Sequence, residues 1–317
     1  MMIESRSGIG VGRAYGSCGE LLQGVTAGDR HFLVTLPIRR GSVAVFEPGG
    51  ESITVAPEHK SKARRLASAM IARSPLLRGG RLTVHSELPE GKGLASSTAD
   101  LVATARAVAD AEGRVLPVAE LEADLRAIEP SDGVMYPGTV AYLHREVRLL
   151  ARLGTLPALT IVTGDEGGTV DTVEFNREQH RFGPAAQREY DRLLDDLRLA
   201  VARGDAAGIG AVATRSAQLS TALRARPHLE STIRAASAIG AVGVVVAHSG
   251  TTTGILLADA HPRCREQLLA ARRICAEFAG AVTVHHTWRP GPTAETRTPP
   301  VDHTYRSAVF RSESTPR

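Results

Sequence analysis

The sequence has few aromatic residues, few cysteines and no long hydrophobic run. Aromatic residues make up 4% of the 317 residues, so aliphatic side chains and alanine must fill the interior. The three cysteines, Cys18, Cys264 and Cys275, match neither a disulfide framework nor a CxxC metal site. The chain has no apolar stretch of about 18 residues and no signal-peptide core. These absences predict a soluble cytoplasmic protein with no membrane partner.

Lysine is the other scarce residue. The chain has 35 arginines and three lysines, and Lys92 is the only lysine after Lys62. The net charge of +4 and the pI of about 9.2 come from basic residues that are scattered along the chain. No nucleic-acid-binding motif accompanies them, so we expect no nucleic-acid partner. Because lysine is scarce, the position of Lys92 between two glycines suggests a specific role for its side chain.

The hydrophobic pattern predicts strands and helices in two successive halves. With 43% hydrophobic residues, a chain of this length is expected to form two packed domains. In the first half, β-type runs lie within residues 10–46 and at 81–88, and helical periodicity covers 96–113 and 118–129.

The second half is expected to begin with a short buried strand at 159–164, followed by a polar stretch. Helices are then expected near 187–203, 205–224 and 228–239. Residues 241–286 have the pattern of strand, Gly/Thr loop, strand, helix and strand. From Trp288 onward the chain is rich in Pro, Thr, Arg and Ser, which predicts disorder.

Residues 88–100, LPEGKGLASSTAD, connect a predicted strand to a predicted helix through a glycine-containing turn. The unpaired N–H groups and the positive dipole end of a helix N-terminus attract phosphate, and glycine lets the backbone approach it. Lys92 adds a positive charge, and serine hydroxyls can reach phosphate oxygens or Mg²⁺. A plain strand–turn–helix joint with an N-cap serine is the alternative. The loop is neither a Walker A loop nor a Rossmann GxGxxG turn.

The segment PEGKGLASSTA resembles the second signature of the GHMP kinases (galacto-, homoserine, mevalonate and phosphomevalonate kinases), P-x-G-x-G-L-x-S-S-x-A. The segments YGSCGELLQG at 15–24 and AHSGTTTGILL at 247–257 resemble the first and third signatures, in the same order. Ala95 departs from the pattern, because the family often has glycine there. The residues that match the second signature are Pro89, Gly91, Gly93, Leu94, Ser96, Ser97 and Ala99.

This resemblance, which spans roughly residues 10–286, implies a two-domain α+β GHMP kinase fold. The N-terminal domain, expected at 1–155, would resemble domain 2 of ribosomal protein S5 and bind ATP. The C-terminal domain, expected at 156–287, would be ferredoxin-like, and residues 288–317 would form the disordered tail. ATP and the alcohol substrate would lie between the domains. The sequence leaves open whether the protein forms a homodimer.

Within the family, GSCGELLQG and IEPSDGVMYPG are most similar to the L-threonine kinases of propanediol utilisation and cobalamin synthesis. The resemblance implies an enzyme that uses ATP and Mg²⁺ to phosphorylate a small hydroxy amino acid, first of all L-threonine to O-phospho-L-threonine. Two alternatives are another acceptor, such as homoserine or a natural-product intermediate, and a non-catalytic nucleotide-binding regulator. The presence of Ser97, Glu129 and Asp132 together argues against the regulator, which need not keep a base.

The resemblance also implies roles for single residues. Ser97 matches the hydroxyl that binds Mg²⁺, and Glu129 is the expected second ligand, since Mg²⁺ prefers hard oxygen donors. Asp132 matches the aspartate that acts as base in many members. The alternatives are an exposed helix-end carboxylate for Glu129 and a turn residue for Asp132. The residues expected to bind the nucleotide are Pro89, Gly91, Lys92, Gly93, Leu94, Ala95, Ser96, Ser97 and Thr98.

The acceptor side of the site is expected to come from both ends of the chain. Glu20 would order the substrate, with Gln23 beside it, although Glu20 would equally suit a salt bridge that braces a loop. A second group, which would otherwise form a polar hairpin without a ligand, is Ser249, Gly250, Thr251 and Thr252. Cys18 is interpreted as a small buried residue and not as a nucleophile. No histidine pair has the spacing of metal ligands.

Overall fold

The computed structural model describes residues 8–168 and 182–290. The first half contains two long antiparallel strands, β1 (Gly10–Val25) and β2 (His31–Pro48). The other strands of this half are β3 (Ile53–Ala56), β4 (Gly80–Ser86), β5 (Thr139–Leu143) and β6 (Arg148–Gly154). Its helices are α1 (Ser61–Ile71), α2 (Ser96–Ala111) and α3 (Val118–Arg126). Strand β4 pairs with β2 and with β3, and β5 pairs with β2 and β6.

Helix α2 packs directly on the long strand β1, and small residues make this possible. A Cβ atom added to Gly12 would lie 2.0 Å from the carbonyl oxygen of Ala103, and one added to Gly10 would lie 2.0 Å from that of Ala107. The helix backbone therefore touches the sheet backbone. Because few aromatic side chains are present to fill the space between helix and sheet, dense packing is reached by close approach of the two backbones.

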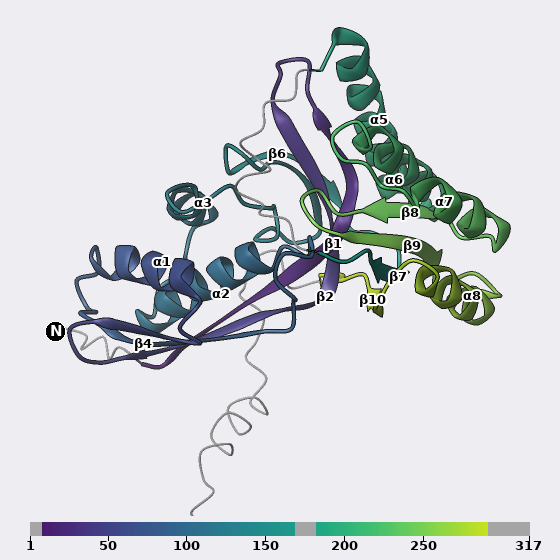
Figure 1. The fold of residues 1–317 in the computed structure, drawn as a ribbon. Coiled ribbons are helices and arrows are strands. Elements are labelled where there is room, and N and C mark those ends of the chain that lie inside the picture. The colour runs from purple at the N-terminus through teal and green to yellow at the C-terminus, as the bar shows by residue number, and fades with distance from the viewer. Residues whose placement is uncertain (1–7, 169–181, 291–317) are drawn as a thin grey trace, which may run out of the picture.

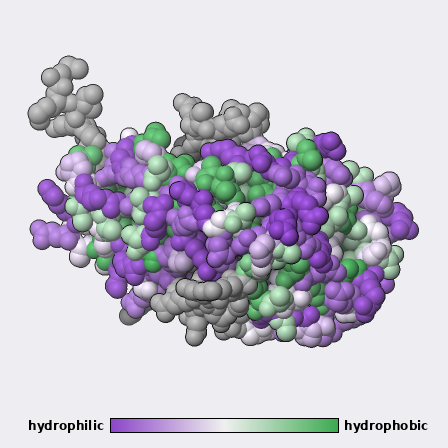
Figure 2. Space-filling model, turned by 90° about the horizontal axis from the view of Figure 1, so that it is seen from above, coloured by the Kyte–Doolittle hydropathy of each residue, from purple (hydrophilic) through white to green (hydrophobic). Residues whose placement is uncertain are grey.

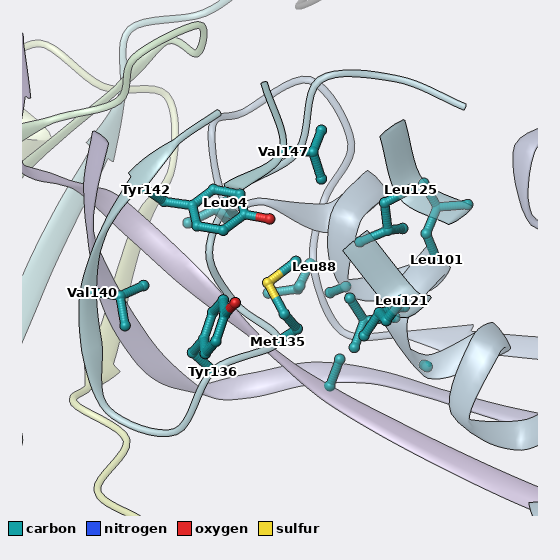
Figure 3. Packing of buried hydrophobic residues seen from close by; sticks show 14 of the residues in the cluster. Leu88, Leu94, Leu101, Leu121, Leu125, Met135, Tyr136, Val140, Tyr142 and Val147 are labelled. Carbon is teal, nitrogen blue, oxygen red and sulfur yellow. The ribbon is translucent and has the colours of Figure 1, made fainter. Parts of the chain in front are cut away.

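A hydrophobic cluster beside α2 and α3 supports the segment that follows α3. In Figure 3, Met135 lies between Tyr136 and Tyr142 on one side and Leu121 and Leu125 on the other. The two tyrosine hydroxyls both donate to Glu122 on α3, at 2.7 and 3.0 Å. This packing holds residues 129–135 against the start of α2.

The second half forms an antiparallel sheet with helices after its first and third strands. Its strands are β7 (Leu159–Asp165), β8 (Gly243–Val246), β9 (Thr252–Ala258) and β10 (Val282–His286). Helices α5 (Pro184–Arg203), α6 (Ala206–Ser220) and α7 (Leu229–Ala238) precede β8, and α8 (Cys264–Ala276) precedes β10. The strand order β10-β7-β9-β8 is that of a β-α-β-β-α-β ferredoxin-like unit. The expected α+β fold is confirmed.

One ten-stranded sheet joins the two halves, because β1 lies beside β8. The joint is a single residue pair, Glu20 with Val246. A second contact comes after the end of β10, where the ring of Trp288 stacks on that of Tyr15 with centroids 4.5 Å apart. The backbone N–H of Trp288 donates to the carbonyl of Pro37. Trp288, the first residue of the predicted disordered tail, is therefore part of the fold. Residues 291–317 of that tail lie outside the described residues.

The predicted elements agree with the structure in kind, with shifts at their ends. The helix predicted over 118–129 ends as an α-helix at Arg126, although the N–H of Glu129 still donates to the carbonyl of Leu125. The helix expected at 205–224 ends at Ser220. Elements that the sequence analysis missed are α1, β3, β5 and β6.

The surface combines hydrophilic and hydrophobic side chains. Figure 2 shows hydrophilic groups over most of one face, interrupted by smaller hydrophobic patches. Within residues 8–168 and 182–290, every helix is too short or too polar to cross a membrane.

Candidate active site

A cavity of about 350 Å³ lies where the start of α2, the segment after α3 and the joint between the two halves meet. Most of the residues that the sequence analysis selected line this cavity. They are Glu20, Gly91, Gly93, Leu94, Ala95, Ser96, Ser97, Thr98, Glu129, Asp132 and Ser249. The predicted nucleotide, metal, base and acceptor residues thus share one space, although they are far apart in the sequence.

Six selected residues do not line the cavity. Pro89 is exposed on the outer side of the turn. Gln23 is buried one layer behind, where its Oε1 lies 2.9 Å from Nδ1 of the lining residue His248. Lys92, Gly250 and Thr252 form contacts between the glycine loop (89–95) and the loop before β9 (247–251), and the hydroxyl of Thr251 donates to Asp165 at the end of β7.

The two loops touch backbone to backbone, which explains their glycines. A Cβ atom on Gly93, whose φ is +77°, would lie 2.2 Å from that of Ala247, and one on Gly250 would lie 2.3 Å from the carbonyl of Lys92. The hydroxyl of Thr252 donates to the same carbonyl at 2.7 Å. The third signature therefore holds the second one in place.

The side chain of Lys92 points to the second half of the chain. Its Nζ lies 2.7 Å from a carboxylate oxygen of Asp165 and donates to the carbonyl of Gly168 at 2.7 Å. Although burial opposes the shift, hydrogen bonds from Lys92 and Thr251 lower the pKa of Asp165. Lys92 ties the glycine loop to the end of β7 in this structure, where the sequence analysis expected it at the phosphates.

The N-terminus of α2 opens into the cavity without a cap from its own chain. Its N-cap residue, Ala95, has a left-handed backbone with φ of +55°, and no side chain caps the helix. The first turn contains no acidic residue. The N–H groups at the start of the helix and its positive dipole end are therefore available to an anion.

Ser97 and Glu129 meet at the cavity wall. The Ser97 hydroxyl donates to one oxygen of Glu129, and Nζ of Lys62 lies 2.5 Å from the other oxygen. The Glu129 side chain is only 8% exposed, so the alternative of an exposed helix-end carboxylate is wrong. Two hard oxygen donors from different elements are thus adjacent beside the anion-attracting helix end.

Asp132 lies half-buried in the same wall, and its backbone N–H donates to the hydroxyl of Thr98 at 3.2 Å. Burial, and to a smaller extent the charge of Glu129, raise the pKa of Asp132 to about 6. A carboxyl group with this pKa can take up a proton near neutral pH, as a general base must.

Glu20 reaches the cavity from a bulge in β1. The pairing of β1 with β2 shifts register around residues 15–22, and Gly19 has φ of +70°. Such bulges redirect side chains next to active sites. Glu20 is 4% exposed, and burial together with the charge of Asp132 raises its pKa well above the usual range.

The lining residues that the sequence analysis did not select include Lys60, Lys62, His144 and His248. Lys60 is nearly buried and pairs with Asp100 at 2.7 Å and with Glu90 at 2.5 Å. The rings of His144 and His248 meet edge to face with centroids 5.0 Å apart. The scarcity of lysine, which singled out Lys92, was also a signal for the other two lysines, and all three lie at or beside this site.

A protein family matches the part of the chain that forms one wall of the cavity. The family described as "GHMP kinases N terminal domain" matches residues 61–136, which run from α1 through the glycine loop to Asp132 and beyond. This range contains the start of α2 and both carboxylates that follow α3. The match therefore covers the cavity wall contributed by the first half.

Individual proteins with similar sequences are kinases. The chain is 28% identical over 242 residues to the L-threonine kinase of Citrobacter freundii, covering 76% of this chain and 84% of that protein. It is 33% identical over 225 residues to the 4-diphosphocytidyl-2-C-methyl-D-erythritol kinase of Thermobifida fusca, covering 69% and 70%. The crystal structure of homoserine kinase from Cytophaga hutchinsonii has the same fold, with a TM-score of 0.65 at 16% identity over 91% of this chain and 96% of that one.

Proposed function

Since this chain belongs to the GHMP kinase family and is a phosphotransferase with an alcohol acceptor, we propose that it transfers the terminal phosphoryl group of ATP to a small hydroxy amino acid. L-Threonine is the first candidate, because the similarity to an L-threonine kinase extends over 84% of that protein. The product would be O-phospho-L-threonine.

One observation carries the proposal: a single cavity contains an uncapped helix N-terminus, a pair of oxygen donors and a carboxyl group with a raised pKa. Phosphoryl transfer needs the phosphates positioned, their charge neutralised and a group that receives the alcohol proton. The three features supply these needs in that order.

The start of α2 would bind the phosphates of ATP. The N–H groups of its first turn are not used by a side-chain cap, and Gly91 and Gly93 line the approach to them. Lys60, held by Asp100 and Glu90 at the rim, adds a positive charge near the helix end.

Ser97 and Glu129 are suited to Mg²⁺. Their oxygens are already in hydrogen-bond contact, and Mg²⁺ is commonly held by one or two protein oxygens, with water and phosphate oxygens completing the site. A bound Mg²⁺ would supply charge neutralisation for the phosphates. Lys62, on the other oxygen of Glu129, would hold that carboxylate in place.

Asp132 would receive the proton of the attacking hydroxyl. With a pKa of about 6 it is ionised at neutral pH and ready to accept a proton. Because an alcohol becomes acidic only as its bond to phosphorus forms, the proton moves late in the transfer. Holding the hydroxyl in line is then as important as basicity.

A second acceptor class is favoured by one observation. The identity to the 4-diphosphocytidyl-2-C-methyl-D-erythritol kinase, 33%, exceeds that to the threonine kinase, although it covers less of each protein. The second candidate acceptor is therefore 4-diphosphocytidyl-2-C-methyl-D-erythritol.

The test is ADP release from ATP, measured by a coupled assay over a panel of acceptors. The panel contains L-threonine, L-serine, L-homoserine and 4-diphosphocytidyl-2-C-methyl-D-erythritol. We expect the highest kcat/KM with L-threonine and a strongly reduced kcat in Asp132→Asn. Turnover with the cytidyl compound alone would reject the amino-acid acceptor.

A further inference from the structure

We propose that Glu20 binds the ammonium group of the acceptor and thereby makes a charged amine next to the hydroxyl a requirement for binding. This inference rests on the proposed function, because it assigns the acceptor class of the same cavity. It concerns specificity, whereas Asp132 concerns the reacting hydroxyl.

The first argument is that Glu20 is buried without a partner. Its side chain is 4% exposed and lines the cavity, and Oε2 has no hydrogen-bond partner among the described residues. A buried polar group without a partner costs free energy, and a buried carboxylate costs more. A site that keeps such a group facing a cavity gains when a ligand supplies the partner.

The second argument concerns charge. The three lysines near the site are engaged with other acids: Lys60 with Glu90 and Asp100, Lys62 with Glu129, and Lys92 with Asp165. Within the described residues, no ion pair reaches Glu20. The charge that acts on it most is the negative charge of Asp132. Glu20 therefore has no positively charged partner among the described residues, and an ammonium group would supply one.

The third argument is the position of Glu20 relative to Asp132. Both carboxyl groups line one cavity. A β-hydroxy-α-amino acid has its hydroxyl and ammonium groups on neighbouring carbons. Asp132 can then accept a hydrogen bond from the hydroxyl group while Glu20 binds the ammonium group. The two contacts together fix the rotation of the acceptor about the bond between these two carbons.

The competing explanation is that Glu20 is protonated and donates a hydrogen bond to a neutral oxygen of a polyol. This explanation predicts no preference for a charged amine. It also predicts that glutamine, which keeps a donor, substitutes well for Glu20.

The test separates binding from turnover. Binding of L-2-aminobutyrate, which is L-threonine without its hydroxyl, and of butyrate, which also lacks the ammonium, is measured by calorimetry with ADP present. We expect the wild type to bind L-2-aminobutyrate but not butyrate. Loss of one charge-assisted contact should weaken binding of L-2-aminobutyrate to Glu20→Gln by about 10- to 100-fold.

Controls keep the result specific. Glu51→Gln, an exposed change outside the cavity, should bind like the wild type. Unchanged ADP affinity in Glu20→Gln shows that the variant is folded, and Glu20→Asp, which keeps the charge, should retain part of the affinity. Equal binding of butyrate, no binding of L-2-aminobutyrate to the wild type, or unchanged binding by Glu20→Gln would each overturn the inference.

Failure of the inference and failure of the proposed function give different results. If the panel assay shows no turnover with amino-acid acceptors while L-2-aminobutyrate binding still depends on Glu20, the proposed function fails and the ammonium site stands. If L-threonine is phosphorylated but 3-hydroxybutyrate, which has no ammonium, is phosphorylated equally well, the ammonium site fails and the proposed function stands.

Discussion

At the scale of single residues, three carboxyl groups that line the cavity differ in their surroundings. Glu129 is satisfied by Ser97 and Lys62, Asp132 is half-buried with a pKa of about 6, and Glu20 is buried without a partner. Environment thus separates three similar groups into three proposed roles: metal ligand, base and ammonium binder. Differences in burial and partners produce such separation in other active sites as well.

The base is tested by Asp132→Asn together with a pH profile. We expect kcat to fall by about 100- to 10,000-fold, toward the lower limit because positioning dominates phosphoryl transfer. Since the base must be ionised, wild-type kcat/KM should decrease as the pH drops below about 6, and the variant should lack this limb. A variant that keeps more than about half of the wild-type kcat would show that transfer proceeds without this base.

The metal ligands are tested by the Mg²⁺ requirement. Ser97→Ala and Glu129→Gln each remove one of the few protein oxygens expected on the ion, so half-maximal activity should need about tenfold more Mg²⁺ or higher concentrations still. The measurement is activity against Mg²⁺ concentration at saturating ATP. Ser68→Ala, on the exposed side of α1, is the control. Unchanged Mg²⁺ dependence in both variants would remove them from the metal site.

At the scale of elements, the N-terminus of α2 is an unusual helix start. An alanine in the left-handed region serves as its N-cap, where serine, threonine, asparagine or aspartate is preferred. The glycines around it allow the loop to approach β1 and the second half of the chain, and the N–H of Ser17 donates to the carbonyl of Leu94. Helix α2 therefore has no side-chain cap, and the N–H groups of its first turn remain accessible from the cavity.

The strain at this helix start leads to a stability prediction. A left-handed backbone destabilises the folded state by roughly 1–2 kcal/mol when the residue is not glycine. Glycine removes this strain, but its greater conformational freedom in the unfolded chain offsets part of the gain. Ala95→Gly should stabilise the fold by up to about 1 kcal/mol, measured by denaturant unfolding. Ala99→Gly, inside the same helix, should destabilise it by about 1 kcal/mol or more. Destabilisation by Ala95→Gly would show that the alanine methyl group packs productively.

At the scale of the whole molecule, the candidate active site depends on how the two halves meet. Glu20 lies at the one residue pair that joins β1 to β8, and the glycine loop touches the loop before β9 through Gly93 and Gly250. The ion pair of Lys92 with Asp165 crosses the same joint. Any change in the angle between the halves would therefore move the glycine loop and Glu20 together.

The joint is tested by a matched pair of variants. Lys92→Ala and Asp165→Asn break the same ion pair from opposite sides, so both should raise the KM for ATP by a similar, several-fold factor if the pair holds the loop. The alternative is that Lys92 contacts the outer phosphates directly. In that case Lys92→Ala would raise the KM while Asp165→Asn, which frees the lysine, would leave it unchanged or lower it.

Local features of this protein were readable from the sequence because neighbouring residues determine them. The strand–glycine turn–helix unit at 88–100, the helical stripe that follows it and the strand–helix order of the second half all depend on short-range backbone preference and periodicity. Helix α1 and strands β5 and β6 were missed, and β5 gave little signal because all its residues are buried and no alternation marks it.

Only the tertiary structure decided the partners. Ser97 meets Glu129 across 32 residues, and Glu20 from the start of the chain lines the same cavity as Asp132. The direction of Lys92 was also undecided, because a flexible four-carbon side chain beside a turn can reach phosphates or Asp165 equally well. Side-chain pairing and burial follow from how the elements dock, and that docking depends on the complete packed core. The chemistry of each residue was therefore present in the sequence, whereas its neighbours, its pKa and its access to the cavity were set by the fold.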